Sequence, residues 1–413
     1  MAEAAQLSRG DVISVEVLRP AHGGEGVAHH DGRVIFVQGG LPGDVADVEI
    51  TQVKKNFARG IIRRIGNASD FRVESRCPAA SAGAGCCDYS HVDPSRELEL
   101  KVRVLTDQLE RIGGLRHVDS PELKDLEPSS GWRTRVRLGV DASGRAGFRK
   151  QKSNDIVTDA VCSQVVPELL DGLVGDTPRR FTPGAEIIAA IDDRGVRQVV
   201  ESRRAPRGRR TETILSVLEG DGNVTQTVGG HSWTFPVTSF WQAHRAAPAA
   251  YSDFIGEVLG AGVEESAASG EAVAWDLYGG VGLFAPVIVD KLGAHVHSVE
   301  MSKGSARAGE EALAGLPVTF HTGRVEALAS QLPKPAVVVL DPPRTGAGAD
   351  VVRTVADAGP GTIIHIGCDP ATFARDLADW SARGYGLDRL AVFNAFPGTH
   401  HFETIGVLTR RDV

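Results

Sequence analysis

The C-terminal part of the chain alternates apolar runs with longer segments of helical character, and this alternation constrains the fold more than any other feature. The runs that read as strands lie at residues 272–277, 296–299, 318–321, 336–340 and 362–366. Most are followed by an amphipathic or alanine-rich segment of helical length, which predicts a doubly wound α/β fold with a parallel sheet. Two later runs, near 389–393 and 402–408, have no helix between them, so we expect an antiparallel pair.

The rest of the 413-residue chain reads as two further regions. Residues 1–66 contain short alternating strands, at 12–17, 33–37 and 45–50, with glycine-rich turns between them, which predicts a small OB-like β-barrel. Residues 67–235 have mixed α+β character and begin with a cluster of cysteines. Residues 236–413 form the α/β part. The sequence therefore predicts three domains, each long enough to bury a core.

Basic residues are clustered in a chain whose formal net charge is −8. One cluster lies at 54–64, a second consists of Arg133, Arg135 and Arg137, and a third is the arginine run at 203–210. Because the chain as a whole is acidic, an RNA-binding surface has to come from such local clusters. The first cluster is equally compatible with a solvated edge strand, which also uses basic residues.

The sequence contains no feature of an exported or membrane protein. Its start has no basic region followed by an apolar core, and no run approaches the roughly 20 apolar residues that cross a bilayer. We therefore expect a cytoplasmic protein without a membrane partner. Its five cysteines are an odd count for a disulfide framework in so long a chain, which leaves reduced thiols, a metal site or a nucleophile.

Chemically informative residues follow the predicted strands, at the edge where doubly wound sheets bind ligands. A glycine-rich loop at 276–282 follows the first strand, Glu300 ends the second, and Asp341 ends the fourth. A carboxylate after the second strand can accept both ribose hydroxyls of a nucleoside. Because the loop lacks the dinucleotide pattern G-x-G-x-x-G, S-adenosylmethionine is the favoured ligand.

Cys368 follows the fifth strand, directly before a predicted helix. A lone cysteine in such a place is more often a small buried hydrophobe. Here Asp369 is a good N-cap and Pro370 a good first helical residue, so the thiol lies at a helix N-terminus. The helix dipole favours a thiolate there, and we expect a nucleophile at the mouth of the crevice.

A nucleophilic thiol beside a methyl donor indicates methylation of uracil C5, a carbon that is too weak a nucleophile by itself. Addition of a thiolate to C6 makes C5 reactive, and a base must later remove the C5 proton so that the thiol can leave. We predict that Glu403, at the start of the last strand, is this base. His400 and His401 are competitors, but a histidine pair in a loop is usually exposed to solvent.

Taken together, these residues resemble the RNA uracil-C5 methyltransferases, which form 5-methyluridine. The resemblance implies a Rossmann-like class I methyltransferase domain, a TRAM domain at residues 1–66 and a central RNA-binding domain. It implies that Cys368 is the nucleophile and Glu403 the general base. The segment 239–242 is similar to a Phe-Phe-Gln element of the family, and the residues implied in binding S-adenosylmethionine are Gln242, Tyr278, Glu300 and Asp341.

The cysteines depart from the pattern of that family. Members with a TRAM domain often hold a [4Fe-4S] cluster on a C-x5-C-x2-C run and a distant fourth cysteine. In this chain the corresponding residues are Cys77, Cys86, Cys87 and Cys162, and the second and third are adjacent. Adjacent cysteines do not fit the usual ligand loop, so the sequence leaves a cluster open and counts this spacing against it.

Two other functions remain open from the sequence. An amino-group methyltransferase acting on nucleic acid or protein would use the Asp-Pro-Pro-Arg run at 341–344 but neither Cys368 nor Glu403. A non-catalytic RNA-binding protein would retain only the cofactor pocket. The favoured partner is RNA, ribosomal rather than transfer RNA because of the TRAM resemblance, with 23S rRNA as the expected substrate. No obligate protein partner is indicated.

Overall fold

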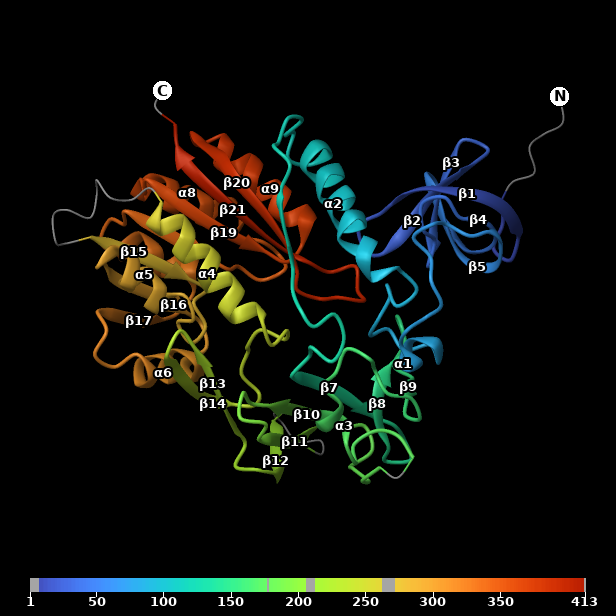
Figure 1. Cartoon of the computed structure of the whole chain (residues 1–413), viewed down its shortest axis with the longest axis horizontal. Coiled ribbons are helices and arrows are strands. Elements are labelled where there is room, and N and C mark those ends of the chain that lie inside the picture. Colours follow the sequence, from blue (N-terminus) through green and yellow to red (C-terminus); the bar gives the residue numbers. More distant parts are fainter. Residues whose placement is uncertain (1–6, 177, 206–211, 262–271, 412–413) are drawn as a thin grey trace.

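The computed structural model describes residues 7–176, 178–205, 212–261 and 272–411. Figure 1 shows a barrel at the N-terminus, a second region of strands and short helices, and a C-terminal α/β part, with helix α2 running between the barrel and the α/β part. Most of the predicted arginine run at 203–210 lies outside the described residues. Among the described residues, no helix is long and apolar enough to span a bilayer.

The N-terminal strands close into a barrel, as predicted. Its strands are β1 (Val12–Pro20), β2 (Glu25–His30), β3 (Arg33–Gln38), β4 (Val45–Val53) and β5 (Phe57–Asn67), in the order β1-β2-β3-β5-β4. Alternate side chains such as Val15, Val17, Ile35 and Val37 are buried inside, which is the period-two pattern of a strand with one wet face.

The basic cluster at 54–64 is largely neutralised within the barrel. Each of its arginines pairs with a barrel carboxylate: Arg59 with Glu25 at 2.5 Å, Arg63 with Glu49 at 2.5 Å and Arg64 with Asp47 at 2.8 Å. Lys54 and Lys55 have no ion-pair partner among the described residues. The arginines therefore belong to a solvated sheet surface, and only the two lysines remain as uncompensated charge.

The central region is built around an antiparallel sheet in the order β12-β11-β10-β7-β8-β9. Its elements are α1 (Pro78–Ser81), α2 (Pro94–Arg111), β6 (Glu122–Asp125), β7 (Arg135–Val140), β8 (Ala146–Arg149), β9 (Ile156–Val157), α3 (Pro167–Leu170), β10 (Glu186–Ile191), β11 (Arg197–Arg204), β12 (Thr213–Glu219) and the hairpin of β13 (Asn223–Val228) and β14 (His231–Pro236). Two of these elements pack elsewhere: α2 lies against helix α9 of the C-terminal part, and β6 pairs with its last-but-one strand.

The C-terminal part is the predicted doubly wound sheet. Its elements are α4 (Ala247–Gly260), β15 (Val273–Leu277), α5 (Ala285–Leu292), β16 (His295–Glu300), α6 (Lys303–Ala312), β17 (Val318–Thr322), α7 (Val325–Leu328), the 3₁₀ turn η2 (Ala329–Gln331), β18 (Val337–Leu340), α8 (Gly348–Ala358), β19 (Thr362–Gly367), α9 (Pro370–Ser381), β20 (Tyr385–Asn394) and β21 (Glu403–Arg410). The strand order is β17-β16-β15-β18-β19-β21-β20-β6. The strand order reverses between β15 and β18, and doubly wound sheets bind ligands at such a switch point.

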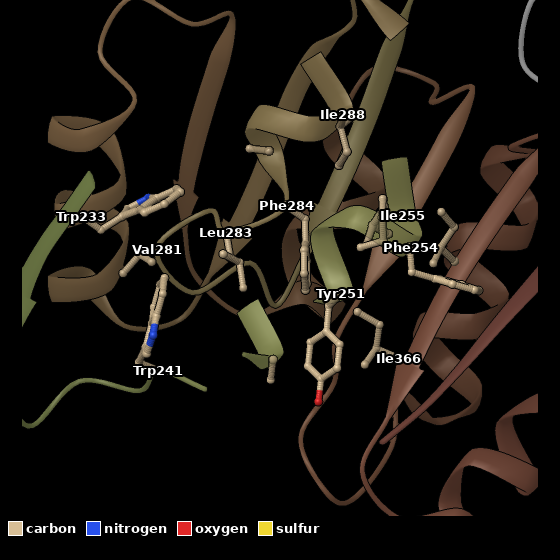
Figure 2. Packing of buried hydrophobic residues seen from close by; sticks show 14 of the residues in the cluster. Trp233, Trp241, Tyr251, Phe254, Ile255, Val281, Leu283, Phe284, Ile288 and Ile366 are labelled. Carbon is tan, nitrogen blue, oxygen red and sulfur yellow. The ribbon is translucent and has the colours of Figure 1, made fainter. Parts of the chain in front are cut away.

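The pairing confirms the expected change from parallel to antiparallel strands. Strands β15 to β19 pair in parallel, whereas β21 lies antiparallel between β19 and β20. Helices cover both faces of the sheet, so β18 (Val337–Leu340) is buried along its whole length. On one face, aromatic side chains of the segment 233–254 pack against the glycine-rich loop and α5, as Figure 2 shows for Trp241, Tyr251 and Phe284.

Candidate active site

Three of the four predicted cofactor residues, Tyr278, Glu300 and Asp341, lie at the carboxyl ends of β15, β16 and β18. The Glu300 carboxylate accepts hydrogen bonds from the Gly280 amide at 3.1 Å and the Ser302 amide at 2.5 Å, so it is fixed against the glycine-rich loop. Asp341 follows β18, and its amide donates to the Leu277 carbonyl at 3.2 Å. Glu300 and Asp341 therefore flank the same loop, at the point where the strand order of the sheet reverses.

The glycine-rich loop is held so tightly that its sequence is restricted. A Cβ atom on Gly279 would lie 2.2 Å from Ser298 Oγ and 2.4 Å from the Asp276 carboxylate, so no side chain fits at this position. Tyr278 has a φ of 62°, in the left-handed region that non-glycine residues rarely adopt. Asp276 is buried and accepts a hydrogen bond from Ser298 Oγ at 3.1 Å. The loop is thus shaped for close approach of a ligand to its backbone.

Gln242 is less well connected to these residues. It lies between β14 and α4, and its side chain is 6% exposed. It makes no hydrogen bond to Tyr278, Glu300 or Asp341 in the described part of the chain. A buried amide without a protein partner is available to a ligand, but the structure does not join Gln242 to the other cofactor residues.

The candidate nucleophile and base stand opposite each other at the ends of two neighbouring strands. In the antiparallel pair of β19 and β21, Gly367 lies opposite Thr404, so the next position places Cys368 across from Glu403. Glu403 is 5% exposed, and its Oε2 atom has no hydrogen-bond partner among the described residues. A buried carboxylate oxygen without a partner costs free energy, so its presence indicates a task other than stability.

Cys368 opens into a cavity of about 170 Å³. Its polar lining comes from the loop after β18, the start of α9, the loop before β21 and the barrel. Besides Cys368, the charged or titratable residues in this lining are His22, Arg344, Asp369, His400 and His401. With Val104 of α2, the cavity thus brings together five separate segments of the chain. Arg344 places a positive charge in this lining, which an anionic ligand such as a nucleotide can use.

Comparisons with known proteins agree with this geometry. A TRAM domain model matches residues 6–62, and a model of tRNA (uracil-5-)-methyltransferases matches residues 320–412, which include Cys368 and Glu403. An uncharacterized RNA methyltransferase of Corynebacterium efficiens is 73% identical over 98% of this chain and 96% of its own length. The chain belongs to the RNA uracil-C5 methyltransferase family. As a member it is an RNA methyltransferase that uses S-adenosylmethionine as methyl donor.

More distant members of this uracil-C5 methyltransferase family also match over the full length. The 23S rRNA (uracil(1939)-C(5))-methyltransferase of Erwinia tasmaniensis is 28% identical and covers 94% of both chains. Among solved structures, the tRNA (uracil-54, C5)-methyltransferase of Pyrococcus abyssi, in complex with S-adenosyl-L-homocysteine, matches with a TM-score of 0.70 and 20% identity, covering 96% of this chain and 100% of that one. The latter likeness supports the fold of the methyltransferase.

The resting thiol of this methyltransferase is protonated, contrary to the expectation from its helix. Burial, together with the nearby carboxylates of Glu403 and Asp341, raises the pKa of Cys368 to about 12. Asp369 caps α9 with its side chain, as predicted, but Cys368 lies outside the first turn, and desolvation outweighs the dipole. Burial also raises the pKa of Glu403 well above its usual range and that of Asp341 to about 7.

We expect the alkylation of Cys368 in the free enzyme to report this protonation state. Only the thiolate reacts, so the rate with iodoacetamide should rise about tenfold per pH unit between pH 7 and pH 10, without a plateau. Removing the carboxylate in Glu403→Gln should accelerate alkylation at pH 8, and Arg344→Gln should slow it. Mass spectrometry of the peptide containing Cys368 measures the rate, and a plateau below pH 9 would contradict the raised pKa.

Arg344 is a site residue whose role the sequence did not reveal. In the sequence it stood out only as the last residue of the Asp-Pro-Pro-Arg run at 341–344. Its guanidinium is exposed to the cavity, 3.4 Å from His401 Nε2. Its positive charge lowers the pKa of both Cys368 and Glu403, opposing the effect of burial. Arg344 is therefore placed to stabilise negative charge on the thiolate or on the ring that it attacks.

The two histidines before Glu403 are half-buried and bound, so the expectation that they are solvent-exposed is wrong. His400 Nδ1 pairs with the Asp88 carboxylate, and the His400 amide donates to the same group at 3.0 Å. Burial and the positive charges of His400 and Arg344 lower the pKa of His401 to about 3. His400 is committed to Asp88, whereas His401 is a neutral imidazole that lines the cavity.

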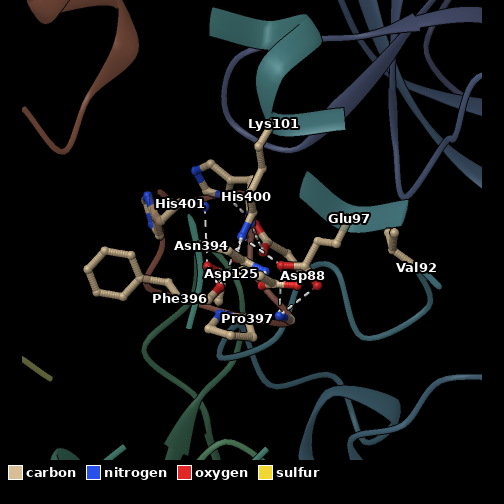
Figure 3. A network of polar contacts seen from close by, with 12 residues as sticks. Asp88, Val92, Glu97, Lys101, Asp125, Asn394, Phe396, Pro397, His400 and His401 are labelled. Carbon is tan, nitrogen blue, oxygen red and sulfur yellow. Dashed lines mark hydrogen bonds and ion pairs between the residues drawn. The ribbon is translucent and has the colours of Figure 1, made fainter. Parts of the chain in front are cut away.

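A buried polar network fixes the loop that carries these residues (Figure 3). Lys101, fully buried on α2, donates to Glu97 and to Asn394 Oδ1, both at 2.6 Å. Glu97 in turn accepts a hydrogen bond from the Gly398 amide at 2.9 Å. Because a broken buried ion pair leaves a charge without a partner, the network ties the segment 394–402 firmly to α2. Glu403 directly follows this fixed segment, so the position of its backbone is well defined.

The four cysteines of the central region converge, despite the adjacency of two of them. The sulfur atoms of Cys77, Cys86, Cys87 and Cys162 all lie within 4.8 Å of one another, and none of them forms a disulfide. The objection from sequence spacing is therefore wrong: the chain turns between Cys86 and Cys87 so that both thiols face the same centre. Arg133 is buried beside them, with its Nε atom unpartnered among the described residues, and its charge interacts with Cys162, Cys87 and Cys86.

Arg133 belongs to the basic cluster that the sequence showed at 133–137, and the other two arginines of this cluster have protein partners. Arg135 donates to the carbonyls of Val237 at 3.0 Å and Ser239 at 2.5 Å, and Arg137 pairs with Glu186 at 2.8 Å. The pattern of alternating arginines therefore does not form one RNA-binding face. Each of the three arginines instead makes its own contact with another part of the protein.

Proposed function

We propose that this methyltransferase converts a uridine of 23S rRNA to 5-methyluridine, with Cys368 as the nucleophile and Glu403 as the base. The observation that carries the proposal is the pairing of β19 with β21, which sets a cavity-lining thiol across from a buried carboxylate that lacks a hydrogen-bond partner. Neither group is needed to methylate an exocyclic amine. Together they supply the two functions that C5 methylation requires.

In the proposed reaction the Cys368 thiol releases its proton to solvent as its sulfur bonds to C6 of the uracil, and the ring electrons move onto C5 and O4. Arg344 stabilises this negative charge. S-adenosylmethionine supplies an electrophilic methyl group, which C5 takes up as the methyl–sulfur bond breaks and S-adenosylhomocysteine leaves. Glu403, as the carboxylate, then removes the C5 proton, the electrons of that C–H bond re-form the C5–C6 double bond, and the C6–S bond breaks to release Cys368. The raised pKa of Glu403 makes it a stronger base than an exposed carboxylate.

We propose that Glu300 binds the ribose of S-adenosylmethionine, with Tyr278, Asp341 and Gln242 as the other cofactor residues. Each Glu300 oxygen already accepts one amide hydrogen bond, which leaves further lone pairs that can accept the ribose hydroxyls. We expect Glu300→Gln to weaken binding of S-adenosylmethionine about tenfold, because it replaces an acceptor by a donor. Glu310→Gln, an exposed position on α6, is the matched control, and calorimetry is the measurement. Equal affinities for the two variants would remove Glu300 from the site.

We further propose that the four cysteines hold a [4Fe-4S] cluster. Four sulfurs within 4.8 Å, three of them on buried residues and Cys86 half-buried, are a suitable donor set, and the buried charge of Arg133 offsets the negative charge of a thiolate-bound cluster. Such a cluster contributes no atom to the methyl transfer. It would hold together the chain segments that carry Asp88 and Gln164, whose side chains bind His400 and the Pro397 carbonyl.

Replacing Cys162 with serine should therefore remove most of the iron and lower the thermal midpoint by about 5 °C or more, because cluster binding contributes to folding. Cys368→Ser, the fifth cysteine, is the matched control and should keep its iron. Iron and sulfide analysis of anaerobically purified protein measures the difference. Zinc in place of iron, or no metal in the wild-type protein, would contradict the cluster.

The choice of ribosomal RNA rests on two observations: the TRAM match at residues 6–62 and the full-length match to a 23S rRNA methyltransferase. We accordingly propose that the enzyme acts in the cytoplasm, where its substrate is made. The test is to map 5-methyluridine in total RNA of a deletion strain and to repeat the reaction with purified enzyme. Loss of one 23S rRNA site supports the proposal, whereas loss from transfer RNA alone would contradict it.

A further inference from the structure

The barrel reaches into the cavity of the nucleophile. Its turn between β1 and β2 contributes Ala21, His22 and Gly23 to the cavity that Cys368 lines. The turn is rigid, because the Ala21 amide donates to the Glu25 carbonyl at 2.7 Å and the Gly24 amide to the Ala21 carbonyl at 3.3 Å. A domain matched as an RNA-binding module thus supplies part of the wall around the reacting sulfur.

A direct polar contact joins the turn to the residue next to the nucleophile. His22 Nε2 lies 3.0 Å from Asp369 Oδ2. The other carboxylate oxygen, Oδ1, accepts the amides of Ala371 at 3.1 Å and Thr372 at 3.0 Å and so caps α9. Asp369 therefore bridges the barrel and the helix that starts beside Cys368, one oxygen for each.

A second contact, which does not involve His22, fixes the position of the turn 21–24. A Cβ atom on Gly24, whose φ is +80°, would lie 2.9 Å from Asp88 Oδ2 and 3.2 Å from His400 Cβ. The turn thus packs against the Asp88–His400 pair without room for a side chain. Its position is defined by both sides of the cavity, the nucleophile's helix and the loop that leads to Glu403.

We propose that the turn 21–24 of the barrel forms one wall of the pocket that receives the target uridine, and that His22 is a positioning residue that holds Asp369 and, through it, Cys368. The inference rests on the proposed function of Cys368. It makes the barrel a part of the catalytic pocket in addition to its role as an RNA-binding module. His22 keeps 39% of its side-chain surface exposed, so it can also touch an entering nucleotide.

The contact has an electrostatic consequence for the thiol. The hydrogen bond to Asp369 raises the pKa of His22 against the effect of burial. For Asp369, burial opposes ionisation, but the contacts with His22 and with the amides of Thr372 and Ala371 lower its pKa to about 2. The Asp369 charge adds to those that disfavour the Cys368 thiolate. A protonated His22 offsets this charge, as Arg344 does from the other side of the cavity.

The test compares His22→Ala, His22→Gln and His29→Ala in the full-length enzyme. Glutamine can place a donor near the position of imidazole Nε2, and His29 is an exposed histidine of the same barrel on β2. Two quantities are measured for each variant: kcat and KM for methylation of its RNA, and the rate of covalent adduct formation with RNA that contains 5-fluorouridine. Circular dichroism establishes that each variant is folded.

We expect His22→Ala to lower kcat and the adduct rate about tenfold or more with KM changed less than about threefold, as a displaced nucleophile requires. His22→Gln should recover most of the loss, and His29→Ala should match the wild type. If His22→Ala has an unchanged kcat, or a raised KM as its only change, the positioning role is wrong. The role is also wrong if His22→Ala fails to fold while His22→Gln folds and is inactive. Absence of adduct in the wild type would instead reject the proposed function itself.

Discussion

Replacement of Cys368 by alanine should lower methyl transfer to RNA by about 10⁴-fold or more, because the variant has no group that can add to uracil C6. The remaining site should be intact. Cys368 contributes no hydrogen bond to the fold in the described part of the chain, and Glu300 and Asp341 lie on other strands. Transfer of labelled methyl from S-adenosylmethionine to RNA is the measurement.

Binding of S-adenosylmethionine and of RNA serves as the control for this variant, and both should stay within about threefold of the wild type. Cys368→Ser should be equally inactive, since a serine hydroxyl is a far weaker nucleophile than a thiolate. Retention of more than about one per cent of the activity would favour an amino-group methyltransferase, for which the thiol is dispensable.

Replacement of Glu403 by glutamine should stall the reaction after methyl transfer. Glutamine has nearly the same shape but cannot accept the C5 proton, so the C6–S bond cannot break and the enzyme remains joined to methylated RNA. We expect turnover to fall by about 10³-fold or more while a denaturant-resistant adduct accumulates. A gel of enzyme incubated with labelled S-adenosylmethionine and RNA shows the adduct as a slower band that carries label.

The double variant Cys368→Ala, Glu403→Gln should form no such band, which identifies the adduct as a thioether. If Glu403→Gln turns over at nearly the wild-type rate, another group removes the proton. His401 is a neutral imidazole in the cavity lining, and its replacement would then be decisive. A variant that neither turns over nor forms an adduct would place Glu403 before the addition step instead.

Much of this site could be predicted because the sequence shows where each apolar strand ends. Apolar runs such as 336–340 and 362–366 end at Asp341 and Cys368, and the parallel sheet brings their ends to one edge. The two last strands lacked a helix between them, which led to the antiparallel pair and to Glu403 beside Cys368. These inferences need only periodicity and the position of polar residues.

The properties that sequence could not supply depend on burial and on distant segments. Burial and the nearby carboxylates raise the pKa of Cys368. From the sequence, the position at a helix N-terminus predicted a lowered pKa instead. Cys162 meets Cys87 across 75 residues, and the spacing of the other cysteines argued against a shared site. His22 reaches Asp369 across 347 residues, and no local pattern marks such a contact.

The covalent step is tested most directly with RNA in which the target uridine is replaced by 5-fluorouridine. Addition and methylation can proceed, but fluorine cannot leave as a cation, so no base can complete the elimination. Wild-type enzyme should be trapped, and after digestion with nuclease and protease one peptide should carry the mass of a methylated fluorouridine nucleotide on Cys368. The same nucleotide on another residue, or complete absence of a trapped peptide from enzyme that methylates normal RNA, would contradict the account.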